Sequence, residues 1–441
     1  FGPLPAFGNL SGVAGPYTTP AIHAEILSVF TNSAPVHPYR GAGRPEATLL
    51  IEQVIDQAAR ELDVDRVELR RVNMIPASAM PYQTPLSYLY DCGEFERNMD
   101  AALANVDVAG LEARREEARA DGKILGFGIA NAVEQAAGMF DEGAEIRVDG
   151  DGVATLLSGV HSHGQGHATV FRQVVAEKLG LEEHQIRFIQ GDTDLVPYGH
   201  GTGGSRASGL AGTAFAMAAD RVAEKGKAIA AHMLEAAVED VEFTDGVFNV
   251  VGTDQKVTFA DVAKTAHTVR ALPPGMDSGL KAFASFTPPG PTFPNACHIC
   301  EVLLDPDTGE ITYTRYCAVE DVGNVMNPML LKGQLHGGIV QGLGQVTLED
   351  MVFDDEAQLL SGSFMDYAMP RADQMPAFEI ESQPVPTEKN PLGVKGVGEA
   401  GTVGALAAGV SAVNDALAQA GAQPIGMPMT PERVWAALRD G

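Results

Sequence analysis

Apolar and polar positions alternate along this 441-residue chain with two different periods. A period near two predicts strands, at 21–31, 124–133, 144–148, 153–160, 186–190, 296–304 and 310–319. Apolar residues at helical spacing predict helices, at 45–61, 65–73, 168–179, 210–238, 329–348, 405–420 and 431–439. The mixture predicts an α+β or mixed α/β fold. A chain of this length exceeds one ordinary core, so two or more packed units are expected.

Four glycine-rich loops interrupt this pattern, and each leads into a predicted helix. They lie at 36–46, 161–167, 199–209 and 393–404. Glycines let a backbone approach a ligand closely, and the start of a helix directs N–H groups and a positive dipole end towards an anion. Neither G-x-x-x-x-G-K-[ST] nor G-x-S-x-G occurs in the chain. Several such loops suit one large, polar, phosphate-bearing cofactor.

The loop at 393–404 carries one carboxylate among five glycines, that of Glu399. A carboxylate desolvated on a tight turn has a raised pKa and suits a general base. The alternative is an acidic residue that does no more than cap a helix N-terminus.

The loop at 161–167 contains three histidines, His161, His163 and His167. We do not predict a metal site there, because no carboxylate or thiolate lies nearby and the segment turns from strand to helix. The amide of Gln165 and the N–H groups around it instead suit a polar ligand. The four cysteines are irregularly spaced, and the lone Cys297–Cys300 pair is interpreted as structural, without a disulfide framework or an iron–sulfur cluster.

Charge and hydropathy exclude several classes of protein. The formal net charge is −28, from 58 acidic and 30 basic residues, which disfavours a nucleic-acid or anionic-membrane binder. No apolar run approaches the ~18 residues of a membrane span, and no signal peptide is evident. We therefore expect a cytoplasmic protein.

Five motifs, in order and spacing, resemble the molybdopterin-binding large subunit of the xanthine oxidase and aldehyde oxidase family, and most of all its carbon-monoxide-dehydrogenase-like branch. They are Tyr39–Glu46, Gly164–His167, Gly203–Ser208, Gly337–Gln345 and Gly396–Glu399. The resemblance covers essentially the whole chain. It implies an α+β fold of two mixed α/β molybdopterin-binding units packed around a cofactor cleft, with 1–122 as the rear part of the first domain and 123–441 as the second.

The resemblance also implies chemistry. In this family a pterin dithiolene holds the molybdenum without protein ligands. A glutamate matching Glu399 removes a proton from the metal-bound hydroxyl, which attacks an electron-poor carbon while hydride passes to a sulfido ligand. Arg40 is the second expected catalytic residue. The pterin, expected in its cytosine dinucleotide form, would be bound by Gly41, Ala42, Gly164, Gln165, Gly166, His167, Gly204, Ser205, Arg206, Ala207, Ser208, Gln341 and Gly398.

Two departures from the family pattern bear on function. The family's copper-dependent carbon monoxide dehydrogenases carry a cysteine beside the arginine, and 39–44 has none, so an aldehyde or an N-heterocycle is the expected substrate. The family's front, hammerhead-type domain and its glutamine over the metal have no counterpart in this sequence. The expected partners are an FAD-binding subunit, a [2Fe–2S] subunit and a chain supplying that N-terminal part, around a homodimeric core.

Two alternatives stay open. The chain could be a truncated, cofactor-free remnant or scaffold without turnover. It could also be a hydrolase that pairs Glu399 with His167 or His200, although no nucleophile motif accompanies them.

Overall fold

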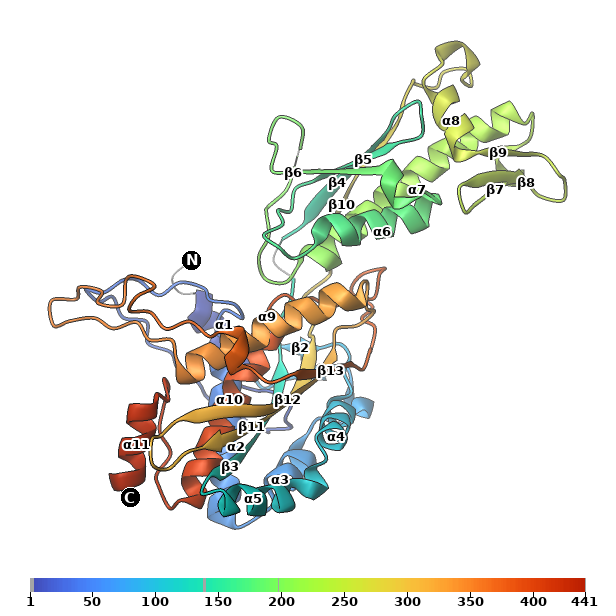
Figure 1. Ribbon diagram of the computed structural model, residues 1–441. Helices are drawn as coiled ribbons and strands as arrows, with labels where there is room; N and C mark the ends of the chain where they lie inside the picture. Colours follow the sequence, from blue (N-terminus) through green and yellow to red (C-terminus); the bar gives the residue numbers. More distant parts are fainter. Residues whose placement is uncertain (1–3, 138–139, 197, 441) are drawn as a thin grey trace. The chain divides into compact units, whose positions relative to one another are not determined.

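A computed structural model describes residues 4–137, 140–196 and 198–440 (Figure 1). Its contacts divide the chain into two compact units that are not consecutive in sequence. The first contains the chain up to Ala136, Thr292–Thr387 and Lys395–Gly441, and the second contains Ala137–Pro291 and Glu388–Val394. Each unit combines a sheet with helices, which confirms the predicted α+β class. The boundary expected after residue 122 falls within the first unit, and the division into sequence domains there stays a prediction.

The first unit is built around a four-stranded sheet of order β13-β12-β11-β3. The strands of the first unit are β1 (Tyr82–Gln83), β2 (Leu89–Tyr90), β3 (Ile124–Val133), β11 (Asn295–Leu304), β12 (Ile311–Asp321) and β13 (Phe378–Ser382), of which β1 and β2 form a separate pair. Its helices are α1 (Leu4–Gly12), α2 (Arg44–Leu62), α3 (Arg66–Asn73), α4 (Phe95–Asn105), α5 (Leu111–Ala120), α9 (Pro328–Thr347), α10 (Ala400–Gln419) and α11 (Pro431–Asp440). β3, β11 and β12 pair antiparallel, whereas β13 joins β12 in parallel.

The two faces of β3 carry side chains of different size, because successive residues of a strand point to opposite faces. Phe127 and Ile129 belong to the core that packs with α4 and α5. The opposite face presents Gly126 and Gly128 to α10. A Cβ at Gly128 would lie 2.1 Å from the carbonyl oxygen of Ala408, so α10 packs directly on the backbone of β3.

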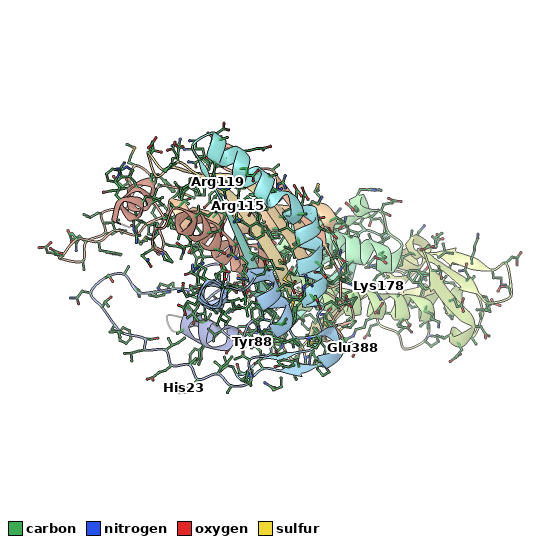
Figure 2. The ribbon with its side chains drawn as sticks, turned by 90° about the horizontal axis from the view of Figure 1, so that it is seen from below. His23, Tyr88, Arg115, Arg119, Lys178 and Glu388 are labelled. Carbon is green, nitrogen blue, oxygen red and sulfur yellow. The ribbon has the colours of Figure 1, made fainter. Side chains whose placement is uncertain are left out.

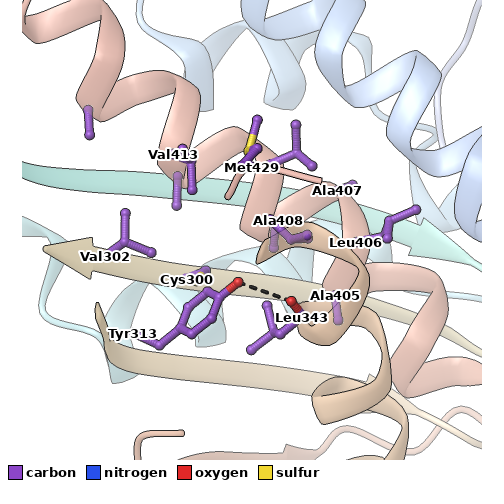
Figure 3. Packing of buried hydrophobic residues seen from close by; sticks show 14 of the residues in the cluster. Cys300, Val302, Tyr313, Leu343, Ala405, Leu406, Ala407, Ala408, Val413 and Met429 are labelled. Atoms are coloured by element: carbon purple, nitrogen blue, oxygen red, sulfur yellow. Dashed lines mark hydrogen bonds between the residues drawn. The ribbon is translucent and has the colours of Figure 1, made fainter. Parts of the chain in front are cut away.

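Helix α9 packs on α10 by a similar close approach. A Cβ on Gly342 would lie 2.7 Å from that of Ala405. Leu343, one residue further along, contributes to the apolar core that α10 shares with β11 and β12. Tyr313 donates a hydrogen bond from its hydroxyl to the Leu343 carbonyl oxygen, at 3.2 Å, and so anchors α9 to β12 (Figure 3). Small residues on α9, α10 and β3 thus fix the path of α10.

The second unit has a four-stranded sheet of order β10-β4-β5-β6, with α6 and α7 packed together beside it (Figure 1). The strands of the second unit are β4 (Glu142–Val148), β5 (Ala154–Ser158), β6 (Ile186–Gln190), β7 (Val241–Thr244), β8 (Val247–Val250), β9 (Lys256–Thr258) and β10 (Leu280–Phe286), of which β7, β8 and β9 form a separate sheet. Its helices are α6 (His167–Leu179), α7 (Ala207–Met233) and α8 (Phe259–Ala266). β4 pairs antiparallel with β5 and β10, and β5 pairs parallel with β6.

Most predicted elements are confirmed, but the strand predicted at 21–31 is wrong. The segment that contains His23 is an exposed loop (Figure 2). Val29 and Phe30 are 68% and 103% exposed, so adjacent side chains are both in solvent and no buried face exists. No strand within the described ranges pairs with it. An alternating sequence pattern does not by itself form a strand, because the backbone N–H and C=O groups also need a partner strand to hydrogen-bond with.

No helix in the described part of the chain is both long enough and apolar enough to cross a bilayer.

The packing of α10 on β3 gives a stability prediction. Replacing Gly128 with valine places a Cβ against Ala408, and we expect a loss of about 3 kcal/mol in the free energy of unfolding. Urea unfolding followed by circular dichroism measures it. The matched control is Gly333→Ala in α9, where a Cβ meets no heavy atom within 4 Å and a gain of about 0.5–1 kcal/mol is expected. Equal unfolding midpoints for wild type and Gly128→Val would contradict this packing.

Candidate functional site

The loop before α2 is a tight turn that only particular residues can form. Gly41 and Gly43 have φ values of +106° and +96°, in the region where glycine carries no steric cost, and Ala42 between them has φ +45°. A Cβ on Gly41 would lie 2.4 Å from Cγ of Pro45, in the first turn of α2. The turn therefore exposes the Gly41 N–H and points the neighbouring Arg40 side chain in a fixed direction.

The Arg40 guanidinium ties this turn to α9 and to the segment just before α10. Its Nε donates to the carbonyl oxygen of Gly398, and its Nη2 donates to both the carbonyl and Oε1 of Gln334, each at 3.1 Å. A longer contact of 3.4 Å joins its Nη1 to Oε1 of Gln341. Burial lowers the pKa of Arg40, and the charge of Glu399 opposes that effect. The sequence-predicted residues Arg40, Gln341 and Gly398 are therefore brought together.

Glu399 is the residue that precedes the first turn of α10. Its carboxylate does not cap that helix, and instead Oε1 accepts a hydrogen bond from the Gly41 N–H at 3.0 Å. The side chain is half-buried, beside the positive end of the α10 dipole and near the Arg40 guanidinium. The acid-cap alternative thus does not describe this carboxylate, which the 39–44 turn orients.

Sequence reasoning missed a second carboxylate at this turn, that of Glu134. It follows the apolar strand β3 directly and is only 2% exposed. Arg44 donates to Glu134 Oε1 at 2.9 Å, and the same guanidinium donates to the carbonyls of Ala42 and Gln135, at 3.0 and 3.1 Å. The only signal in the sequence was an acidic residue at the end of a long apolar run, which by itself indicates no function.

The environment of Glu134 makes its carboxyl hard to ionise. Burial raises its pKa to about 8, Arg44 opposes the increase, and the nearby Glu399 carboxyl adds to it by charge and as a hydrogen-bond partner. Oε2 of Glu134 has no partner of regular hydrogen-bond geometry within the described ranges. Arg44 and the Glu399 carboxyl thus act on Glu134 in opposite directions.

In the second unit, the loop at 161–167 folds back on itself before α6. Gln165 Oε1 accepts from the His163 N–H, and Ser162 N–H donates to Gln190 Oε1 at 3.0 Å. His167 is buried and stacked on Phe171, and burial with the nearby His161 and His163 lowers its pKa to about 4. The amide of Gln165 therefore shapes the loop, while the space beside Gly164 is open.

In the loop at 199–208 the arginine side chain also contacts the protein itself and so stabilises the loop. Arg206 is buried, donates to the Gly201 carbonyl, forms an ion pair of 3.3 Å with Glu142 and lies over the Phe140 ring. Ser205 has φ +51°, and Ala207 and Ser208 form the start of the 27-residue helix α7. The side chain of Arg206 thus holds the loop, and the backbone and Ser208 lie at the helix N-terminus.

Several glycines of the second unit have free space beside their backbone, which a large cofactor would need. A Cβ built on Gly164, Gly203 or Gly204 would meet no heavy atom within 4 Å. These glycines precede the N-termini of α6 and α7, where unpaired N–H groups and the helix dipole favour anions. The arrangement can receive the anionic part of a large cofactor. No cluster of three or more metal-ligating side chains occurs among residues 4–137, 140–196 and 198–440.

The sequence and the fold are similar to those of several characterised proteins. The chain is 36% identical over 445 residues to the carbon monoxide dehydrogenase large chain of Hydrogenophaga pseudoflava, covering 97% of this chain and 55% of that one. It is 36% identical over 439 residues to the nicotine 6-hydroxylase large subunit of Paenarthrobacter nicotinovorans, covering 96% and 54%. The crystal structure of quinoline 2-oxidoreductase from Pseudomonas putida 86 superposes with a TM-score of 0.94 at 33% identity, covering 99% and 57%. The chain thus spans about half the length of these relatives.

Two family models match the chain directly. Both describe molybdopterin cofactor-binding domains, and they match residues 1–74 and 101–376. The second alone covers more than half of the chain, and its range includes the loops at 161–167 and 199–208. The chain therefore belongs to the family of molybdopterin-binding large subunits that includes xanthine dehydrogenase and carbon monoxide dehydrogenase.

Proposed function

We propose that this chain is the catalytic part of a molybdenum-dependent hydroxylase, with Glu399 as its general base. The observation that carries the proposal is the hydrogen bond from the Gly41 N–H to Glu399, made at a turn that Arg40 joins to α9 and to the segment just before α10. A base must be held in one orientation towards the proton it removes. The backbone donor and the fixed guanidinium supply that orientation.

Each residue of this group has a separate task. Glu399 takes up the proton that the attacking oxygen loses, at its carboxylate, and later releases it to solvent. The Gly41 N–H holds that carboxylate in one orientation before the first turn of α10. Arg40 holds the turn and adds a positive charge that stabilises negative charge developing beside it.

The cofactor would be bound mainly through backbone groups. When bound, it supplies the two-electron acceptor for hydroxylation. We assign its pterin and phosphate contacts to Gly164–His167 and Gly204–Ser208, and the contacts nearer the reacting centre to Gly41, Ala42, Gln341 and Gly398. The open backbone beside Gly164 and Gly204 supports this assignment. A cytosine dinucleotide is the form we propose.

An aldehyde or an N-heterocycle is the proposed substrate class. Relatives named for nicotine, xanthine and quinoline oxidation support the heterocycle. The turn at 39–44 has no cysteine, which argues against carbon monoxide. The hydrolase alternative is weak, since His167 is buried and His200 is engaged by Tyr198 at 2.9 Å.

The proposed hydroxylase needs partners to remove electrons. We propose an FAD-binding chain and a [2Fe–2S] chain, and a further segment or chain that supplies the part matching the front of the relatives, around a homodimeric core. Relatives named as the gamma subunit of a dehydrogenase complex and as a large subunit support a multi-subunit enzyme. The domain division at residue 122 and a cytoplasmic location also stay predictions.

The assignment of the base is tested by Glu399→Gln. This change keeps the side-chain shape and removes the proton acceptor, so we expect kcat to fall by about 10³-fold or more with molybdenum still bound. Turnover of aldehydes and N-heterocycles and molybdenum content by mass spectrometry are measured on protein purified with its partner chains. Glu112→Gln, a surface glutamate of α5, is the control. Wild-type turnover in Glu399→Gln would refute the base, and molybdenum missing from every preparation would favour the cofactor-free remnant.

The cofactor contacts are tested by filling the open backbone. Gly203→Leu places a side chain where no heavy atom of the protein lies within 4 Å of the added Cβ, so the fold can accommodate it. The new side chain would occupy the space that a bound phosphate needs. We expect molybdenum content to fall about tenfold, equivalent to about 1.4 kcal/mol of binding. Gly426→Leu, at an equally open glycine of the first unit, serves as the control. Equal molybdenum contents in the two variants would contradict the assignment.

A further inference from the structure

The turn at 39–44 holds two carboxyls, not one. Its Gly41 N–H bonds to Glu399, and its Arg44 guanidinium bonds to Glu134 while also donating to the Ala42 carbonyl within the same turn. The two glutamates directly follow β3 and directly precede α10, and the turn at 39–44 connects them. Glu134 therefore shares its immediate support with the proposed base.

Two ionised carboxyls are unfavourable at this turn, although two arginines lie beside them. The positive groups near the pair are Arg44, which contacts Glu134, and Arg40, which acts on Glu399. Tyr88 is a further titratable neighbour, and burial raises its pKa further above its ordinary value, so it stays neutral. Two adjacent carboxylates would repel each other in a site where Glu134 has little access to water. One bound proton relieves that repulsion.

We propose that Glu134 is a positioning residue for Glu399, with the two carboxyls sharing one proton and Arg44 holding Glu134 against the turn. The inference rests on the proposed role of Glu399 as the base. The protonated Glu134 carboxyl donates towards the Glu399 carboxylate and so adds to the orientation that the Gly41 N–H gives it. Glu134 keeps its proton throughout, and the proton that Glu399 takes up passes to solvent, so no charge or electron is left over.

This arrangement predicts how stability depends on pH. The pKa of Glu134 is about 8 in the folded chain, against about 4.3 for an unfolded glutamate. A carboxyl with a raised folded pKa contributes stability that is fully present below the unfolded value and is lost as the pH rises through the folded value. We therefore expect wild-type thermal stability to fall relative to Glu134→Gln between about pH 5 and pH 8. A difference in melting temperature that stays constant over this range would contradict the raised pKa.

The shared proton itself is tested by infrared pH titration of the full chain. We expect the carbonyl band of a protonated carboxyl to disappear near pH 8 in the wild type and to be missing from Glu134→Gln. In Glu399→Gln the neighbouring charge is gone, so the same titration should move to lower pH by about one unit. Glu301→Gln, which breaks another buried glutamate–arginine contact, with Arg114 at 2.5 Å, is the control and should leave the titration unchanged.

The outcomes separate this inference from the proposed function. If the band does not move in Glu399→Gln, the carboxyls are not coupled and the inference is wrong, whatever the activity of that variant. If the band moves but Glu399→Gln retains turnover, the coupling stands and the base assignment fails. The comparison of wild type with Glu399→Gln remains decisive even if Glu134→Gln does not fold.

The holoenzyme provides the kinetic test of positioning. Glu134→Gln keeps an N–H donor for Glu399 but cannot titrate, so we expect kcat to fall about tenfold with little change in KM, and the alkaline change in kcat near pH 8 to vanish. A residue that only stabilised the fold would leave the shape of the pH profile unchanged. An unaltered profile in Glu134→Gln therefore overturns the positioning role.

Discussion

The position of the proposed base depends on how closely α10 can approach β3 and α9. Glycines at Gly126 and Gly128 leave the backbone of β3 exposed to α10, and Gly342 does the same for α9. Larger side chains at these points would displace α10 as a rigid element, because packed interiors transmit strain. Since Glu399 directly precedes α10, any displacement of the helix would move its carboxylate away from the Gly41 N–H. Packing at the buried face of the sheet therefore determines geometry at the helix N-terminus.

The turn at 39–44 is the second constraint, and it acts through backbone conformation. Positive φ values at Gly41, Ala42 and Gly43 orient one N–H and one carbonyl in fixed directions. The N–H serves Glu399 and the Ala42 carbonyl serves Arg44, so both carboxyls are oriented by the same few bonds. Of the three, Ala42 bears the steric cost of a positive φ, whereas Gly41 has no Cβ that would meet Pro45 and α10. One strained turn thus orients both the Glu399 and the Glu134 carboxyl.

The sequence predicted the regular elements well where the hydrophobic period was long and bounded by turn residues. The hairpin expected at 296–304 and 310–319 is β11 and β12, each within two residues of its predicted ends. The strand expected at 21–31 failed because periodicity carries no information about a partner strand. Glu399 and Arg40 could be singled out because glycines surround them. Glu134 could not, since its importance arises from contacts with residues far away in sequence, 90 positions from Arg44.

The two groups of candidate residues differ in which atoms they use. In the second unit, the side chains of Gln165 and Arg206 are occupied in shaping their loops, which leaves backbone groups for the ligand. In the first unit, the charged side chains of Glu399 and Arg40 themselves define the site. The chain has a net charge of −28, but two arginines lie beside the two glutamates at this turn, so the local charge differs from that of the whole chain. Local pairing, and not the overall charge, therefore decides whether these carboxyls ionise, because a buried charge responds most strongly to partners within a few ångströms.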